Sequence, residues 1–226
     1  MNIEILHMTE GAKKAKGTTV IIDVFRAFSV ESYFCAAGVK EIVPVGDVNL
    51  AYKLKEENPD FILAGERKGK ILPGFDVGNS PSEVVKLDCL GKTVVHTTSA
   101  GTQGIANAVN ADEILGGSLV NARATANYIK SKNPENVSLV CMGLEALSQT
   151  EEDNLCALYI KSLIEGTDID LQGEIEKLKY TSGAKFFDKA QSSVFPEEDF
   201  HLCTQVDKFN FVLKMTQNGR MKRFDV

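Results

Sequence analysis

The sequence is poor in the residues that build disulfide frameworks and zinc sites. Its five cysteines are odd in number and widely scattered, and none forms a Cys-x-x-Cys pair. Its three histidines have no spacing typical of metal ligands. A disulfide scaffold is therefore excluded, and the cysteines are predicted to be small core residues in a reducing compartment. His96, at the end of an apolar run, is predicted to be a hydrogen-bonded core residue.

Long apolar runs and an excess of positive charge are also missing. No stretch reaches the roughly 18 apolar residues of a membrane-spanning helix, and no apolar run follows a basic start of the chain. The formal net charge of −6 argues against a nucleic-acid binder, which usually has a basic face. We therefore expect a soluble, cytoplasmic protein that binds neither nucleic acid nor a membrane.

Apolar runs alternate with helical patterns through the 226 residues. This alternation predicts an α/β fold, a three-layer α/β/α, Rossmann-like arrangement with a mostly parallel or mixed sheet. The length fits one domain, or two intimately packed halves that divide near residues 115–135. Residues 209–215 and 221–226 flank Asn218-Gly219, which predicts a C-terminal β-hairpin with a tight primed turn.

The stretch from Thr18 to Cys35 is the centre of the predicted fold. Residues 18–22 are β-branched without a break, which is typical of a strand buried on both faces. Asp23 and Arg26 follow the strand, and a helix is expected from Ala27. An acid and an arginine at the carboxyl end of a strand suit a bound metal ion and anion. The same pair also suits a structural ion pair that fixes the turn.

Four predicted strands end in polar segments, which are residues 23–29, 65–80, 97–102 and 143–153. If the strands are parallel, all four segments meet at one edge of the sheet. Carboxylates without histidine or cysteine partners favour a hard cation such as Mg²⁺. Arginines, hydroxyls and free backbone N–H groups suit a phosphate or sulfonate. The combination indicates phosphoryl chemistry.

Each segment also has a structural interpretation. The acids at 151–153 fall in the first turn of a predicted helix, where they complement the helix dipole without any metal. Ser148 or Thr150 is the expected N-cap of that helix. Residues 97–102 fit a capped loop, and residues 65–70 lack the spacing of a nucleotide-binding P-loop.

Two known phosphatase chemistries are excluded by position. No arginine stands six residues after any cysteine, so the cysteine-dependent phosphatase loop is absent. Two residues after Asp23 stands Phe25, whereas haloacid dehalogenase-type phosphatases have a general-acid aspartate there. A phosphatase with this sequence needs another arrangement.

The motifs nevertheless resemble one known family, the 2-phosphosulfolactate phosphatases. They are residues 20–29 (VIIDVFRAFS), 65–67 (GER), 73–81 (PGFDVGNSP), 97–102 (TTSAGT) and 152–153 (ED). They cover most of the chain in the right order, and the segment 73–81 is the most specific. Phe28 and Ala100 depart from the family pattern, in which a small hydroxyl residue and an asparagine are usual.

The resemblance implies an Mg²⁺-dependent phosphomonoesterase that converts 2-phosphosulfolactate to sulfolactate and phosphate, on the route to coenzyme M. By this hypothesis Asp23, Glu152 and Asp153 hold Mg²⁺, and Glu66 is a further candidate ligand. A metal-bound water is then the expected nucleophile, and Asp23 as direct nucleophile is the competing mechanism.

The remaining site residues are assigned to the anionic groups of the substrate. Arg26 and Arg67 join Asp23 and Glu66 as predicted catalytic residues, because they can offset the charge of the phosphoryl, sulfonate and carboxylate groups. The predicted substrate-binding residues are Ser29, Asp76, Asn79, Ser80, Thr97, Thr98, Ser99, Gly101 and Thr102. The alternatives are a phosphatase of other 2-phospho acids and a non-catalytic binder of phosphorylated metabolites. The partner is a small anionic phosphorylated molecule, and a homodimer is left open.

Overall fold

The β-branched run near the start of the chain forms strand β2 (Gly17–Ile22), and all its residues are buried in the computed structural model, which describes residues 1–226. Its neighbours on both sides are parallel strands, β7 (Ala111–Gly117) and β8 (Asn136–Cys141). Val20 and Ile22 face one hydrophobic cluster and Ile21 faces another. The predicted strand, buried on both faces, is confirmed.

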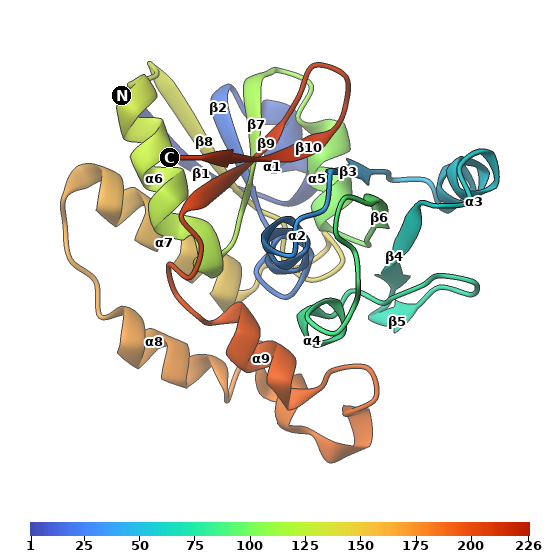
Figure 1. Ribbon diagram of the computed structural model, residues 1–226. Helices are drawn as coiled ribbons and strands as arrows, with labels where there is room; N and C mark the ends of the chain where they lie inside the picture. The colour runs from blue at the N-terminus through green and yellow to red at the C-terminus, as the bar shows by residue number, and fades with distance from the viewer.

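The whole sheet has ten strands in the order β1-β8-β2-β7-β9-β10-β3-β6-β4-β5 (Figure 1). The other strands are β1 (Asn2–His7), β3 (Glu41–Pro44), β4 (Ile62–Arg67), β5 (Lys70–Ile71), β6 (Thr93–Thr97), β9 (Phe211–Met215) and β10 (Met221–Asp225). The antiparallel pair β9–β10 is the predicted C-terminal hairpin. It lies inside the sheet, between β7 and β3.

The strands form two parallel groups that this hairpin joins. Strands β1, β8, β2 and β7 are parallel to one another, and so are β3, β6 and β4. Because β9 is antiparallel to β7, β10 to β9 and β3 to β10, the two groups run in opposite directions along the sheet. The sheet is therefore mixed, one of the two predicted forms, and the condition that all four strands be parallel holds only within each group.

The carboxyl ends of the two groups meet all the same. Adjacent strands are rotated by about 20–25° on average, so the five steps from β2 to β6 add up to about 100–125°. As a result, the start of the helix after β6 reaches the end of β2: a Cβ atom built on Gly101 would lie 3.0 Å from Asp23 Oδ2. The predicted meeting of the polar segments thus depends on sheet twist.

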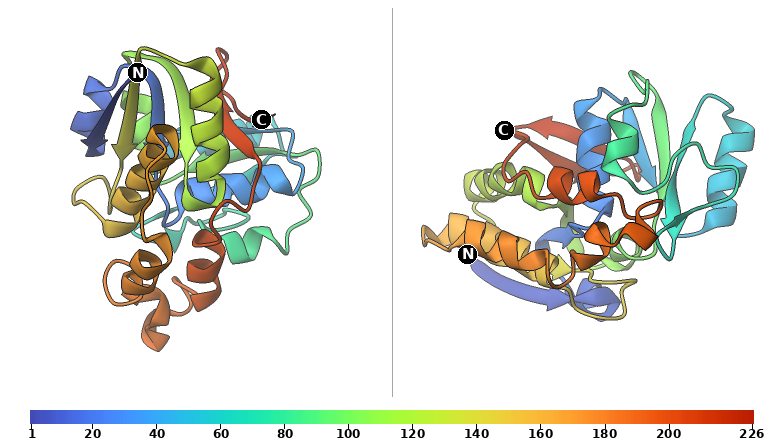
Figure 2. Two further views of the ribbon diagram at one scale, coloured as in Figure 1. Left: turned by 90° about the vertical axis from the view of Figure 1, so that its left-hand side faces the viewer. Right: turned by 90° about the horizontal axis from the view of Figure 1, so that it is seen from below.

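Helices cover both faces of the sheet, which gives the predicted three-layer α/β/α arrangement (Figure 2). The helices are α1 (Met8–Lys14), α2 (Ala27–Ala36), α3 (Val48–Glu57), α4 (Pro81–Val84), α5 (Gly101–Asn107), α6 (Ala122–Lys132), α7 (Glu151–Glu165), α8 (Leu171–Leu178) and α9 (Glu197–Cys203). Three short 3₁₀ segments are η1 (Leu119–Asn121), η2 (Ala184–Phe187) and η3 (Lys189–Gln191). None of the helices combines the length and apolar content that crossing a membrane requires.

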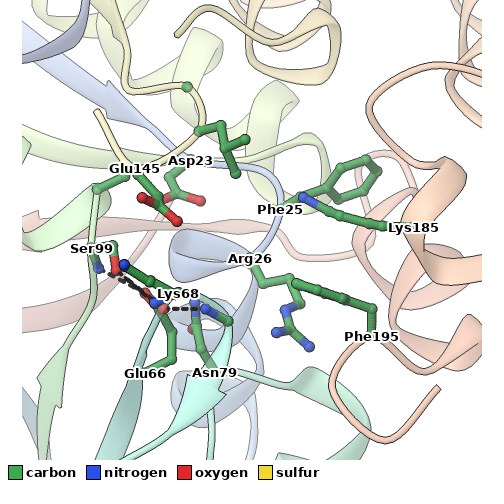
Figure 3. A pocket seen from close by; sticks show the side chains of 14 residues that line it. Asp23, Phe25, Arg26, Glu66, Lys68, Asn79, Ser99, Glu145, Lys185 and Phe195 are labelled. Atoms are coloured by element: carbon green, nitrogen blue, oxygen red, sulfur yellow. Dashed lines mark hydrogen bonds between the residues drawn. The ribbon is translucent and has the colours of Figure 1, made fainter. Parts of the chain in front are cut away.

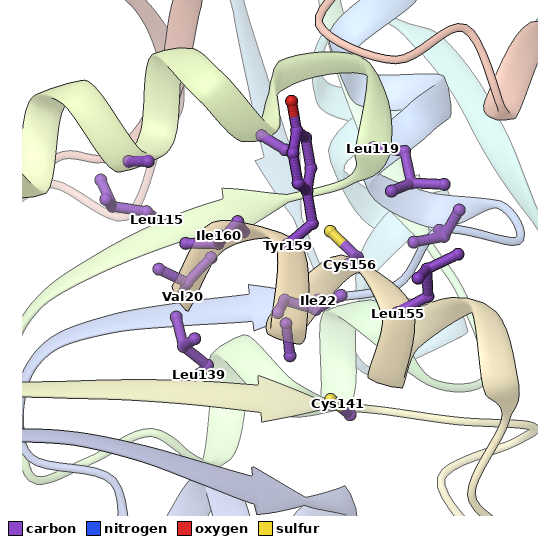
Figure 4. Packing of buried hydrophobic residues seen from close by; sticks show 14 of the residues in the cluster. Val20, Ile22, Leu115, Leu119, Leu139, Cys141, Leu155, Cys156, Tyr159 and Ile160 are labelled. Carbon is purple, nitrogen blue, oxygen red and sulfur yellow. The ribbon is translucent and has the colours of Figure 1, made fainter. Parts of the chain in front are cut away.

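The core lies on both sides of the central strands. On one side, residues of β2, β7 and β8 pack against Leu155, Cys156 and Ile160 of α7 (Figure 4). On the other side, Phe28 and Phe34 of the almost wholly buried α2 pack against β2 and its neighbours. All five cysteines are free and buried, as the sequence predicts.

Three local predictions from the sequence are wrong. The glycine and lysine residues of segment 11–17 predict a loop, but α1 runs from Met8 to Lys14. The glycine and proline residues of segment 65–81 predict an irregular segment, but β4 extends to Arg67 and turns into β5. In that turn Lys68 and Gly69 both have positive φ, the signature of a primed turn. At Asn218-Gly219 only Gly219 does, so the tight primed turn lies in the other hairpin.

Candidate active site

A pocket of about 100 Å³ opens where the carboxyl ends of the two strand groups meet. Figure 3 shows side chains from both groups and from the C-terminal segment around it. Its lining residues are Asp23, Phe25, Arg26, Glu66, Lys68, Gly69, Asn79, Ser99, Ala100, Gly143, Leu144, Glu145, Lys185 and Phe195. Five predicted site residues are among them: Asp23, Arg26, Glu66, Asn79 and Ser99.

Asp23 follows β2 directly, and its carboxylate is almost wholly buried. Oδ1 accepts a hydrogen bond from the Ala27 backbone N–H at 3.1 Å. Burial raises the pKa of Asp23 to about 6; the Ala27 amide opposes this, and the negative charges of Glu66 and Glu152 add to it. Asp23 is therefore a carboxylate that gains from a nearby positive charge.

Glu66 is held rigidly at the end of β4. Oε1 accepts the Ser99 N–H at 2.7 Å, and Oε2 accepts the Gly69 N–H at 2.7 Å and the Ser99 hydroxyl at 3.2 Å (Figure 3). The carboxylate thereby ties the β4–β5 turn to the loop after β6. Both oxygens already have partners, so Glu66 is better suited to shaping the pocket than to binding a metal.

Glu152 and Asp153 lie behind Asp23 in the first turn of α7 and do not line the pocket. Asp153 bridges two strand ends, because its oxygens accept the backbone N–H groups of Val24 and Gly143, each at 2.8 Å. Burial and then the charges of Glu152 and Asp23 raise the pKa of Asp153. Burial also raises the pKa of Glu152, whose Oε2 is enclosed without a hydrogen-bond partner.

Arg26 pairs with a residue far along the chain and not with Asp23. Its Nη1 donates to Asp199 Oδ2 at 2.7 Å and to the Val194 carbonyl at 2.9 Å, and both charged side chains are buried. The interpretation as an Asp23–Arg26 ion pair is therefore wrong. The guanidinium lies over the Phe195 ring, 4.9 Å from its centroid. All its hydrogen bonds use Nη1, so the other N–H groups are free for a ligand in the pocket.

Lys185 is a cation of the site that the sequence pattern does not indicate. It lies on η2, and its Nζ is 5.3 Å from the Phe195 ring centroid and 6.0 Å from that of Phe25. Burial lowers the pKa of Lys185, the charges of Glu152 and Asp23 oppose this shift, and the charge of Arg26 adds to it. Nothing in the local sequence relates residue 185 to Asp23. Lys68 and Glu145 also line the pocket, and the sequence pattern assigns neither of them to the site. Both have positive φ, a backbone strain that is often found at functional sites.

Several predicted substrate-binding residues bond elsewhere. Ser29 bonds to Val24 and Ser118, Asp76 to Leu63 and Lys55, and Ser80 to Ser82 and Asp199. Thr98 and Thr102 bond to each other within their loop. None of these five residues lines the pocket. Their contacts fix the loops that do, which agrees with the structural interpretation of segment 97–102.

Arg67 and Thr97 also lie outside the pocket. The guanidinium donates to the carbonyls of Glu66 and Gly46 and to Thr97 Oγ1, at 2.7–3.1 Å. Arg67 therefore joins the ends of β4 and β6, and Lys68 rather than Arg67 faces the pocket. Gly101 does not line the pocket either, but no side chain could replace it without meeting Asp23 and Ala27.

The donors beside Asp23 suit a hard cation. They are carboxylate oxygens, and the enclosed Oε2 of Glu152 lacks any partner. No three acidic, histidine or cysteine side chains are arranged to hold a metal between them. Mg²⁺ commonly takes only one or two protein carboxylates and keeps several waters. Asp23 and Glu152 fit that requirement, whereas Asp153 is already bonded to two amides.

The chain is similar in sequence to the members of one known family. The family model for 2-phosphosulpholactate phosphatase matches residues 5–218. A protein of Bacillus subtilis (strain 168) named probable 2-phosphosulfolactate phosphatase is 34% identical over 205 residues, which cover 89% of this chain and 88% of its own. Proteins of the same name are 33% identical in Caldanaerobacter subterraneus subsp. tengcongensis, over 88% of both chains, and 41% identical in Clostridium tetani, over 71% and 70%. The chain belongs to the 2-phosphosulpholactate phosphatase family.

Proposed function

We propose that this protein is an Mg²⁺-dependent phosphoric monoester hydrolase that converts 2-phosphosulfolactate to sulfolactate and phosphate. The observation that carries the proposal is the pocket in which the buried Asp23, with its raised pKa, faces the cations Arg26 and Lys185. The family match and the names of the relatives support the substrate. The family resemblance also suggests a place on the route to coenzyme M.

The positive side chains of the pocket suit a substrate with several anionic groups. Arg26 keeps free N–H groups toward the pocket because Asp199 and Val194 engage only Nη1. Lys185 and Lys68 add two ammonium groups on other sides. In an acidic protein, such a local cluster attracts and orients an anionic substrate, and a guanidinium beside the phosphoryl group stabilises the charge of the transition state.

Asp23 and Glu152 are the residues that would hold Mg²⁺. The ion would offset the charge of the phosphoryl oxygens and lower the pKa of a bound water. Asp153 keeps the ends of β2 and β8 together through its two amide bonds, which positions Asp23. The fixed Glu66 shapes the wall opposite Lys185. Asp23 as direct nucleophile stays the competing role for that carboxylate.

Phosphate release tests this proposal. The substrates are 2-phosphosulfolactate, 2-phospholactate, which lacks only the sulfonate, and an activated aryl phosphate, each with Mg²⁺ or with a chelator. We expect Mg²⁺-dependent turnover of all three with the highest kcat/KM for 2-phosphosulfolactate, and none in Asp23→Asn. A kcat/KM for 2-phospholactate at least as high as that for 2-phosphosulfolactate would indicate a broader 2-phospho acid phosphatase. No release from any substrate would leave a non-catalytic binder.

A further inference from the structure

Behind the pocket lies a polar chain that the proposed chemistry does not use. It consists of Glu31 on α2, His96 on β6 and Asn79 before α4, and Glu31 and His96 are fully buried. His96 Nδ1 is 2.9 Å from Glu31 Oε1, and His96 Nε2 is 3.2 Å from Asn79 Oδ1. The expectation of a hydrogen-bonded core histidine is confirmed, but the hydrogen bonds continue from His96 to Asn79, which lines the pocket.

The atoms that face His96 limit where its ring protons can lie. Glu31 has His96 as its only ion-pair partner, and its Oε2 is enclosed without any hydrogen-bond partner. His96 Nε2 faces Asn79 Oδ1, which can only accept, so the contact is a hydrogen bond donated by Nε2–H. Two forms of the pair supply that proton and leave no net charge in the core: imidazolium with carboxylate, and neutral imidazole with carboxylic acid.

Both neutral forms place a proton on Nε2 of His96. In the first form, both ring nitrogens carry protons. In the second, the acid proton of Glu31 is donated to Nδ1, so the ring proton is on Nε2. A protonated Nε2 needs an acceptor, and Asn79 Oδ1 is the atom that faces it.

The bond to His96 decides which end of the Asn79 amide faces the pocket. An asparagine amide can be turned so that oxygen and nitrogen exchange places, and only its hydrogen-bond partners settle the choice. With Oδ1 held by Nε2–H, the NH₂ group of Asn79 points the other way. It donates to no protein acceptor and is not enclosed, so it is available from the pocket.

We propose that Glu31 and His96 are positioning residues that hold Asn79 with its amide N–H groups toward the pocket, where they donate to an anionic oxygen of the substrate. Without the Nε2 proton, Asn79 turns its carbonyl oxygen to the pocket and repels the anion. The inference rests on the proposed function only in assuming that an anion occupies this pocket.

A matched pair of variants tests the role. In His96→Gln the terminal amide nitrogen takes the place of Nε2 and keeps the bond to Asn79. In His96→Asn the amide takes the place of Nδ1 and loses that bond, at similar cost to the core. The readout is the affinity for inorganic phosphate by titration calorimetry, with Asn79→Ala as the reference for complete loss of the donor.

We expect His96→Asn and Asn79→Ala each to bind phosphate about ten- to a hundredfold more weakly, the range for a hydrogen bond to a charged group. The double variant His96→Asn/Asn79→Ala should lose no more phosphate affinity than either single variant. His96→Gln should stay within about threefold of the wild type, a small effect on the affinity scale. Equal affinities in His96→Gln and His96→Asn would overturn the inference.

A second measurement is made on the wild type and uses a variant only to assign the signal. The chain has three histidines, and only His96 is fully buried, so ¹⁵N-edited spectra of the wild type can show a slowly exchanging Nε2 proton. His96→Gln assigns that signal. An Nε2 without a proton would overturn the inference, whether or not the protein hydrolyses 2-phosphosulfolactate. No turnover with the proton present would overturn the proposed function alone.

Discussion

Glu152 and Asp153 are neighbours at the start of α7, but the backbone fixes only one of them. Glu152 Oε2 has no hydrogen-bond partner, and burial raises the pKa of Glu152 more than Ser182, Lys185 and Thr150 lower it, so Glu152→Gln removes a charge that burial disfavours. We expect the free energy of unfolding without metal to stay the same or rise, and the Mg²⁺ concentration for half-maximal activity to increase at least tenfold.

Asp153→Asn is expected to lower stability and to leave the Mg²⁺ requirement unchanged, the opposite of Glu152→Gln. Both carboxylate oxygens accept backbone amides, and an asparagine must turn its NH₂ group toward one of them. The lost bond should lower the free energy of unfolding by about 1–3 kcal/mol, partly offset by relief of charge repulsion, and leave the Mg²⁺ requirement little changed. Urea unfolding in chelator and Mg²⁺ titration of activity measure both quantities.

Glu151→Gln is the control for both variants. Glu151 is exposed in the same helical turn, so its loss removes only the interaction with the helix dipole, about 0.3–1 kcal/mol. If Glu152→Gln matches this control in stability and in Mg²⁺ requirement, Glu152 is not a ligand.

Arg26 and Arg67 should differ in how replacement by lysine changes the stability and the kcat/KM of the protein. Arg67 donates only to protein oxygens, so Arg67→Lys should lower stability by about 1–3 kcal/mol and kcat/KM less than threefold, equally for 2-phosphosulfolactate and an aryl phosphate. Arg26→Lys loses the fork that bonds Asp199 and faces the pocket. It should lower kcat/KM at least tenfold for both substrates. A loss of kcat/KM in Arg67→Lys that is confined to 2-phosphosulfolactate would instead show that Arg67 binds an anionic group of that substrate.

At the scale of elements, the segment from η2 to α9 closes one side of the pocket. It supplies Lys185 and Phe195, and it is anchored by the buried pair between Asp199 and Arg26. Phe195 also packs on the β4–β5 turn, because a Cβ atom on Gly69 would lie 2.5 Å from its ring. The segment thus contacts both strand groups.

Asp199→Asn should loosen this segment without unfolding the sheet. Removing one member of a buried ion pair leaves the other charge uncompensated, which costs about 3–5 kcal/mol. We expect faster hydrogen exchange in residues 184–203, slow exchange preserved in β2 and β8, and a fall in kcat/KM for every substrate. The control is Glu198→Gln, on the same helix as Asp199, which removes only the exposed ion pair of Glu198 with Lys86 beyond α4. Unchanged exchange in residues 184–203 would contradict the anchoring role.

The sequence indicates elements whose cause is local, and misses those set by distant contacts. β2 and the polar strand ends are predicted because a β-branched run and its following residues lie together in the chain. The pair of Arg26 with Asp199 joins positions 173 residues apart, and no local pattern predicts it. The same holds for Lys185. Arg67 is predicted at the site because its guanidinium can offset anionic charge, but successive residues of a strand point to opposite faces, and Glu66 has the face toward the pocket.

At the scale of the whole molecule, the site joins two parallel strand groups and buries several carboxylates between them. The negative charges of Asp23, Glu152 and Asp153 lie close enough to affect one another, and burial raises the pKa of each. The fold therefore stores charge repulsion at the place where the two groups meet. A bound cation or bound protons relieve it, so metal binding, pH and global stability are expected to be linked.

For Asp23 stability changes with pH in the opposite direction to that of an acid whose pKa is lowered by folding. Its pKa is about 6 when folded against an ordinary value of 3.8, so the folded state binds more protons between these values. Metal-free protein should gain stability as the pH falls through 6 and lose it as the pH rises. The pKa difference corresponds to about 3 kcal/mol at full titration.

Thermal unfolding of the wild type and Asp23→Asn measures this linkage. In chelator at pH 7.5, Asp23→Asn should unfold at a higher temperature than the wild type, and the difference should shrink toward pH 5. Mg²⁺ at a hundred times its Kd stabilises by about 2.7 kcal/mol, so it should raise the Tm of the wild type by several degrees and that of Asp23→Asn far less. Surface carboxylates contribute equally to both proteins and cancel in the difference. A Tm difference that does not change with pH, together with equal Mg²⁺ shifts, would show that Asp23 neither titrates near 6 nor takes part in binding the ion.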